Sequence, residues 1–339
     1  MRHHTISPVT RCLPPPAWGR TGVAGLLALA ISSAPGLADT AAVVQDHARP
    51  GYAAFALAAT RLAAIESCDP EALRPAFQAT YDAWMAVAHL ALGPAEEDGR
   101  ALAIHFWPDP KRLGAKAQTA LLTGDPAALS PDLIAQQSVA ARGLSGLERL
   151  LYPAEALPAD PCPLIQATAD DLARMATALD ADWGPYGDLL LAAGQPGNDR
   201  FLSEDEATQA LFTQLATGLE AVADRRIGRP LGSFDKPRPD LAESRASDRP
   251  VQNIRLSLRA LRDLALRLNP DSPKTKAAFD RAIGLADALD PDIDRIADPQ
   301  GWLKLEILQQ AVRATRDTAI AELGPALGVE LGFNAQDGD

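Results

Sequence analysis

The stretch Gly143-Leu144-Ser145-Gly146-Leu147-Glu148 places a hydroxyl and a carboxylate three residues apart. On a helix, side chains at that spacing lie on the same face. Apolar residues recur through the stretch at helical spacing, which puts Glu148 beside a predicted core. Because an unpaired buried carboxylate is costly, Glu148 needs a partner or a function. Either an Arg from a neighbouring segment neutralises it, or it is an anionic ligand in an inter-helix cleft that it lines with Ser145.

A second group of chemically capable residues is His105-Phe106-Trp107-Pro108-Asp109, in a predicted connection between helices. Two large aromatic side chains in a connection must pack against something, so this segment docks on the fold. His105 is either a half-buried hydrogen-bonded imidazole or a ligand, and Asp109 either caps the next helix or is a ligand. We expect one of them to approach Glu148, so the candidate metal ligands are Glu148, His105 and Asp109.

The first stretch resembles the signature of the imelysin family, Gly-x-His-x-x-Glu on a helix. Gly143 and Glu148 match, while Ser145 stands at the histidine position. Further short segments support the resemblance in order along the chain: His105–Asp109, Ile227–Gly232, Pro237–Pro239 with Glu243 and Asn253, and Leu331–Asn334. The resemblance implies a fold of two packed helical bundles and a link to iron uptake, and it carries a peptidase label.

The histidine position decides which chemistry the motif supports. A neutral hydroxyl is a poor ligand for zinc or iron, so Ser145 weakens a metallopeptidase site. The sequence has no His-Glu-x-x-His, and Ser145 has no recognisable base or nucleophile elbow. We therefore expect a non-catalytic protein that binds metal or a partner; the alternatives are a metal-dependent peptidase of the imelysin type and a pure interaction scaffold. The candidate cofactor is a divalent metal or iron.

Composition supports an all-helical protein. The 339 residues are 47% hydrophobic but only 5% aromatic, and Ala and Leu dominate. This balance favours helices over sheets. The formal net charge of -12 argues against nucleic-acid binding, because an acidic chain repels phosphate backbones.

The first 38 residues have the order of a signal peptide: a basic lead, an apolar run over residues 22–31, and small residues up to Ala38. Cleavage after Ala38 predicts export to the periplasm or cell envelope. No later run is long enough to span a bilayer, so we expect no transmembrane segment after cleavage. Iron-uptake proteins of the envelope are the expected partners. In that oxidising compartment, Cys68 and Cys162 form either a disulfide or two separate thiols; we expect the disulfide.

Helical periodicity divides the remaining chain into two predicted lobes, residues 39–195 and 196–339. The motif helix is predicted to run from Ser130 to Tyr152, and a proline- and charge-rich connection occupies residues 225–250. That connection is either an internally paired loop or an anion clamp. The other predicted helices are Tyr52–Glu66, Pro70 to Gly93, Leu164–Leu179 with a break at Trp183–Gly187, Ser203–Val222, Val251–Leu268, and helices over 273–289 and 300–323.

Overall fold

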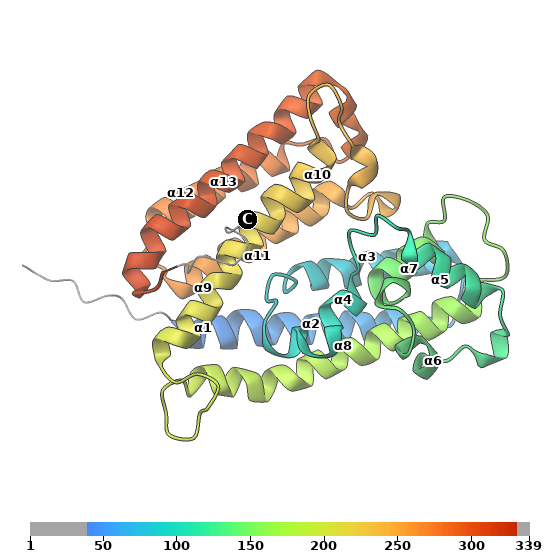
Figure 1. Ribbon diagram of the computed structural model, residues 1–339, viewed down its shortest axis with the longest axis horizontal. Helices are drawn as coiled ribbons and strands as arrows, with labels where there is room; N and C mark the ends of the chain where they lie inside the picture. Colours follow the sequence, from blue (N-terminus) through green and yellow to red (C-terminus); the bar gives the residue numbers. More distant parts are fainter. Residues whose placement is uncertain (1–38, 331–339) are drawn as a thin grey trace, which may run out of the picture. The chain divides into compact units, whose positions relative to one another are not determined.

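Helices form the architecture of residues 39–330, which a computed structural model describes (Figure 1). The predicted signal peptide and the segment Leu331–Asn334 lie outside the described residues. Within them the β-structure is limited to one isolated bridge between Ser233 and Lys236, which confirms the predicted all-α class. No helix of residues 39–330 is both long and apolar enough to cross a membrane.

The α-helices are α1 Thr40–Val43, α2 Arg49–Ala63, α3 Pro70–Met85, α4 Arg100–Ile104, α5 Leu113–Leu122, α6 Pro131–Ala135, α7 Gly143–Leu151, α8 Cys162–Leu191, α9 Glu204–Glu220, α10 Gly228–Leu231, α11 Pro250–Leu268, α12 Pro273–Asp287 and α13 Pro299–Leu327. Two π-helices are η1 Val44–Ala48 and η6 Ala221–Ile227. Short 3-10 turns are η2 Gly93–Ala95, η3 Glu97–Gly99, η4 Pro126–Ala128, η5 Val139–Ala141, η7 Pro239–Leu241, η8 Arg245–Ser247 and η9 Ile293–Ala297.

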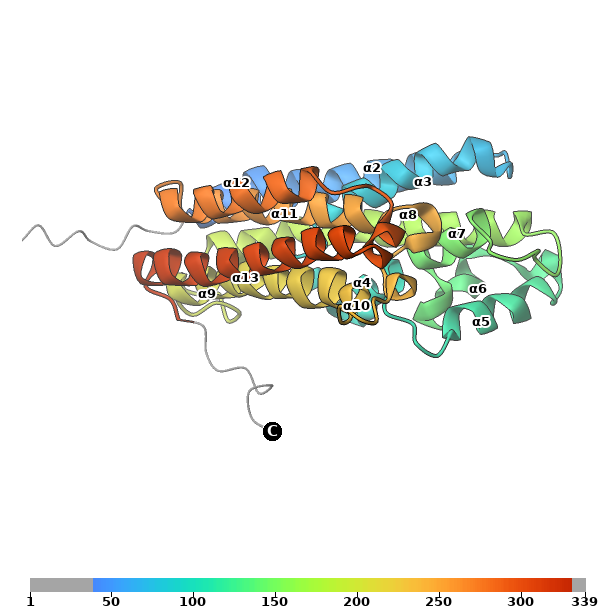
Figure 2. The same ribbon diagram turned by 90° about the horizontal axis from the view of Figure 1, so that it is seen from above.

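Two groups of long helices build the described part of the chain. In the first group α2 packs against α3 and α8, and in the second α11 packs against α9 and α12, which packs on α13 (Figures 1 and 2). The groups meet where α11 contacts α3. Their buried apolar side chains form one continuous core. The loop between α8 and α9 holds the expected lobe boundary at residues 195/196, which stays a prediction.

Several helix starts follow from predicted capping residues. The side chain of Asp69 accepts the Glu71 N–H ahead of α3, and that of Ser203 accepts the Glu206 N–H ahead of α9. These bonds satisfy amide groups that the first helical turn leaves without partners. α11, α12 and α13 carry proline in the first turn, where the missing N–H costs nothing. Their spans agree with the predicted helices.

Two predicted helix ends are wrong. α3 ends at Met85 instead of reaching Gly93. α8 continues to Leu191, straight through the expected break at Trp183–Gly187. Trp183 is fully buried and stacks on Tyr52 of α2 with ring centroids 5.0 Å apart. We attribute the continuity of α8 to this packing, which opposes the helix-breaking effect of proline and glycine.

The motif helix is also shorter than predicted. Ser130 caps α6 as expected, but α6 ends at Ala135 and α7 begins only at Gly143. Gly143 has φ +57°, and a Cβ there would lie 2.3 Å from the carbonyl oxygens of Ala103 and Ile104. Only glycine tolerates both the left-handed backbone and that contact. The break therefore lets α7 dock against the end of α4.

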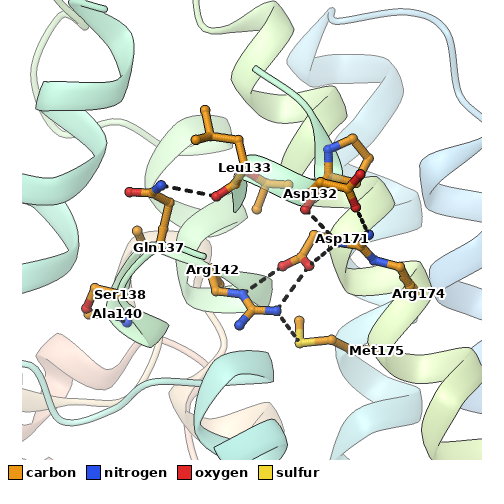
Figure 3. Close-up of polar contacts among 12 residues, drawn as sticks. Asp132, Leu133, Gln137, Ser138, Ala140, Arg142, Asp171, Arg174 and Met175 are labelled. Atoms are coloured by element: carbon orange, nitrogen blue, oxygen red, sulfur yellow. Dashed lines mark hydrogen bonds and ion pairs between the residues drawn. The ribbon is translucent and has the colours of Figure 1, made fainter. Parts of the chain in front are cut away.

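The extended residue before Gly143 anchors the break. Arg142 donates from Nε and Nη2 to Asp171 of α8, at 2.9 and 3.1 Å (Figure 3). The Asp171 side chain is 1% exposed and also accepts from Arg174 at 3.1 Å. The paired geometry of guanidinium and carboxylate ties the start of α7 to α8.

A disulfide links the segment before α3 to the start of α8, within the first group of helices. Cys68, next to the cap of α3, is bonded to Cys162 at the start of α8, with Cα atoms 5.3 Å apart and a sequence separation of 94. A bridge over so long a loop removes conformational freedom from the unfolded chain.

We predict that Asp171→Asn lowers the free energy of unfolding by about 3–5 kcal/mol, because it leaves the largely buried Arg142 without its charged partner. Urea unfolding followed by circular dichroism measures this. The neighbouring Asp170 is exposed, so Asp170→Asn is the matched control and should change stability by less than about 0.5 kcal/mol. Equal effects of the two substitutions would show that the buried pair does not anchor α7.

Candidate functional site

Glu148 of α7 is 9% exposed and faces the connection that precedes α11. Its Oε1 accepts hydrogen bonds from the Ser247 N–H at 3.1 Å and the Ser247 hydroxyl at 2.6 Å. The partner thus comes from the predicted 225–250 connection, but it is a serine and not the expected arginine. Burial raises the pKa of Glu148, and the bonds from Ser247 oppose that rise.

Ser145 holds the segment that follows α4. Its Oγ accepts the backbone N–H of Phe106 at 3.0 Å, and Ser145 itself is 5% exposed. Together with the close contact of Gly143 on the end of α4, this bond fixes the backbone next to His105. Gly143 and Ser145, two positions of the motif, therefore help to fix the position of His105, which lies outside the motif.

His105 faces residues from both halves of the chain. Its Nε2 lies 2.6 Å from the Tyr81 hydroxyl, which lies 2.6 Å from the Ser244 hydroxyl. Its Nδ1 lies 3.8 Å from Oε1 of Glu243. Burial, assisted by Arg226, lowers the pKa of His105 to about 4 in spite of Glu243. The imidazole is therefore neutral at neutral pH.

Glu243 supplies a buried carboxylate with one oxygen engaged. Its Oε2 accepts from Arg226 Nε at 2.8 Å and from Asn253 Nδ2 at 2.9 Å. Burial would raise the pKa of Glu243, but the charge of Arg226 and the hydrogen bonds from Arg226 and Asn253 outweigh burial, so the net shift is downward. An ionised carboxylate thus stands beside a neutral imidazole, the two protonation states that metal coordination requires.

Arg249 completes the network on the side of α3. It is 1% exposed, donates to Asn253 at 3.0 Å and pairs with Asp82, and its guanidinium lies 4.2 Å from the centre of the Tyr81 ring. Burial, together with Glu243 and Glu148, raises the pKa of Tyr81 well above its usual value. Tyr81 therefore stays a neutral hydroxyl that can donate or accept.

Asp109 is occupied elsewhere. Its two carboxylate oxygens accept the backbone N–H groups of Leu113 and Gly114 at 2.8 and 2.9 Å, at the start of α5. Within residues 39–330 no group of three or more His, Cys, Asp and Glu side chains is placed to share a metal ion. The metal-binding role of Glu148, His105 and Asp109 stays a prediction; His105 has Glu243 as its nearest carboxylate partner.

Next to His105 and Glu243, a cavity of about 240 Å³ opens between the two groups of helices. α3, α4, α9, η6 and α11 all contribute to its wall, which includes His89, Trp107, Arg225 and Arg226. We call this cavity the cleft. A neutral imidazole, a carboxylate and two guanidinium groups at one opening can hold an anionic chelate or a metal ion.

Sequence reasoning missed much of this network. Arg226, Glu243 and Arg249 belong to the charge-rich connection or its edge, whose opposite charges were the available signal. Tyr81 had no such signal, because its place in the apolar stripe of α3 conceals a hydroxyl that faces His105. The expected burial of Glu148 agrees with the structure.

We predict that Glu148→Gln changes the free energy of unfolding by less than about 1 kcal/mol, because an amide oxygen can still accept both bonds from Ser247. Glu148→Ala should cost about 1–3 kcal/mol more, since it leaves the buried Ser247 N–H without an acceptor. Thermal or urea unfolding of the two variants makes the comparison. If Glu148→Gln costs as much as Glu148→Ala, the negative charge is required and an ion pair holds Glu148.

Comparisons with known proteins agree with this fold. The chain is 25% identical over 309 residues to iron-regulated protein A of Synechococcus elongatus, covering 81% of this chain and 82% of that relative. An imelysin-like protein from Psychrobacter arcticum has a similar crystal structure, with a TM-score of 0.71, 20% identity, and coverage of 87% of this chain and 96% of that one. A protein described as an iron-regulated protein A precursor, from Parabacteroides distasonis, aligns with a TM-score of 0.54, 14% identity, and coverage of 84% and 94%.

The two structural likenesses concern the fold, since both identities are low. The family assignment rests on a separate sequence match. The model of the imelysin family (peptidase M75) matches residues 42–319, and because this match spans most of the sequence, the chain belongs to the imelysin family.

Proposed function

We propose that this chain is an exported, non-catalytic binding protein of iron uptake, and that it holds an iron-bearing ligand in the cleft. The observation that carries the proposal is the pair formed by His105 Nδ1 and Glu243 Oε1, which lie 3.8 Å apart on the cleft wall. Among residues 39–330 neither atom has a hydrogen-bond partner in the network around it. Both are therefore available to a ligand.

The chemistry of the pair suits iron. Imidazole nitrogen and carboxylate oxygen are both common ligands of this metal. Two protein ligands leave most coordination positions to water or to a chelator, so the intrinsic affinity for a bare ion is modest. Arg225 and Arg226 add positive charge at the cleft, although the chain as a whole is acidic. That local charge favours a chelate that carries carboxylates.

Export and the iron link rest on separate observations. Residues 1–38 have the order of a signal peptide, and one structural relative is described as a precursor. The curated relative is named as iron-regulated. We propose the periplasm or cell envelope as the location and other iron-uptake proteins of the envelope as partners.

The alternative function is a metal-dependent peptidase, which the family label favours. Such an enzyme needs an array of metal ligands around an activated water. In this chain Ser145 occupies the motif histidine position, and its Oγ accepts the Phe106 N–H. Glu148 in turn accepts from Ser247. These contacts give both motif residues structural roles, which favours a non-catalytic binding protein over a peptidase.

We predict that the purified chain binds ferric citrate and that His105→Gln and Glu243→Gln each weaken binding at least about tenfold. Isothermal titration calorimetry measures the affinity. Glu97 is an exposed residue of η3, so Glu97→Gln is the matched control and should bind as the unmodified chain does. Unchanged affinity in both cleft variants, with native circular dichroism, would contradict the proposed site.

The same preparation separates binding from peptidase activity. We expect no cleavage of an unstructured protein substrate such as casein, with or without added Zn²⁺ or Fe²⁺. Cleavage that Glu148→Ala abolishes would overturn the non-catalytic assignment and support the peptidase.

A further inference from the structure

A second polar group lies on the cleft wall, away from His105. His47 belongs to the π-helix η1, and His89 lies in the turn that follows α3. Their Nε2 atoms are only 3.0 Å apart, although 42 residues separate them in sequence. His47 is 8% exposed, and His89 lines the cleft. Two imidazole nitrogens therefore point at the same place.

A carboxylate sets the tautomer of His47. Nδ1 of His47 lies 2.7 Å from Oδ2 of Asp263 on α11, and the same oxygen accepts from Arg267 at 2.8 Å. Asp263 also forms an ion pair with Arg267. The carboxylate accepts from His47, so Nδ1 of His47 carries a hydrogen, and in the neutral imidazole Nε2 then presents its lone pair to His89.

His89 cannot satisfy both of its nitrogens in this setting. Its Nε2 lies against Nε2 of His47 and its Nδ1 is buried, and a neutral imidazole has only one hydrogen to share between the two. If the hydrogen is on Nε2, it bonds to His47 and leaves Nδ1 buried without a partner within residues 39–330. If it is on Nδ1, that N–H is likewise buried without an acceptor within residues 39–330, and two lone pairs face each other at 3.0 Å.

The second tautomer offers two nitrogen lone pairs at the spacing of two ligands of one metal ion. Metal–imidazole bonds are about 2.0–2.1 Å long, so two nitrogens 3.0 Å apart subtend about a right angle at a shared ion. A carboxylate on the far nitrogen of a ligating histidine is the usual second partner of such sites, since it fixes the ring and raises its basicity. The cleft beside His89 gives water access to the remaining coordination positions.

Two segments that carry polar side chains of this region have an unusual backbone. His47 lies in η1, while Arg225 and Arg226 lie in η6, the other π-helix of the described residues. A π-turn adds one residue and changes the direction of the side chains that follow, and such turns are frequent at functional sites. The π geometry of η1 therefore belongs to the segment that aims His47 at His89.

We propose that His47 Nε2 and His89 Nε2 bind a divalent first-row transition-metal ion, with Asp263 holding His47 in the required tautomer. The site takes the free ion, and Cu²⁺ binds it more tightly than Zn²⁺, as nitrogen ligands generally prefer. It is separate from the His105–Glu243 pair and does not depend on the proposed function.

The test is a titration of the purified, untagged chain with Cu²⁺ and with Zn²⁺, followed by electron paramagnetic resonance of the Cu²⁺ complex. His3 and His4 are replaced by alanine in every sample, because they could bind the ions themselves. We expect one ion per chain and a spectrum with two equatorial imidazole nitrogens. His47→Ala and His89→Ala should each weaken Cu²⁺ binding at least tenfold and remove the two-nitrogen spectrum, and Asp263→Asn should weaken it about 10- to 100-fold.

His105→Gln is the control, because it removes the cleft's other imidazole and should leave the spectrum and affinity unchanged. If circular dichroism shows that His89→Ala is unfolded, His89→Gln replaces it in the titration. Folded His47 and His89 variants that bind Cu²⁺ as before would overturn the proposal, as would loss of the signal in His105→Gln alone. Ferric citrate binding is tested with the His105 and Glu243 variants, and Cu²⁺ binding with the His47 and His89 variants. Each proposal can therefore be contradicted independently of the other.

Discussion

The two groups of helices bury polar side chains where they meet. The structure depends on giving these side chains hydrogen-bond partners. The connection before α11 passes between the two groups of helices and gives three of these side chains a partner: Ser247 bonds to Glu148, Ser244 to Tyr81, and Glu243 to Arg226. Leaving any of these groups without a partner would cost free energy comparable to a lost core contact. The connection is therefore fixed by hydrogen bonding, although it has little regular secondary structure.

The backbone of the connection is shaped for this task. Ser244 and Asp248 have φ values of 50° and 57°, a left-handed conformation that residues other than glycine seldom adopt. Such conformations persist where surrounding contacts require them, and they gather at functional sites. Here they bring Glu243, Ser244 and Ser247 to face both α3 and α7, so that hydrogen bonds to Tyr81 and Glu148 offset the conformational cost.

Sequence periodicity is enough to predict elements whose stability is local. α11 and α13 agree with their predicted spans because apolar spacing and first-turn prolines act within each helix. The break before α7 and the continuity of α8 depend instead on distant partners, Asp171 for Arg142 and Tyr52 for Trp183. The candidate site also depends on partners that are distant in sequence. The burial of Glu148 is visible in the sequence, but its partner Ser247 lies 99 residues away, where no spacing rule applies.

The serine at the motif histidine position changes where an imidazole can come from. A histidine at residue 145 would project from α7, whereas Ser145 holds the Phe106 N–H and so fixes the backbone beside His105. The imidazole at the cleft is thus supplied by the segment after α4, with Tyr81 bonded to one nitrogen and Glu243 near the other. The position of the imidazole at the cleft is therefore set by the docking of the segment after α4 on α7.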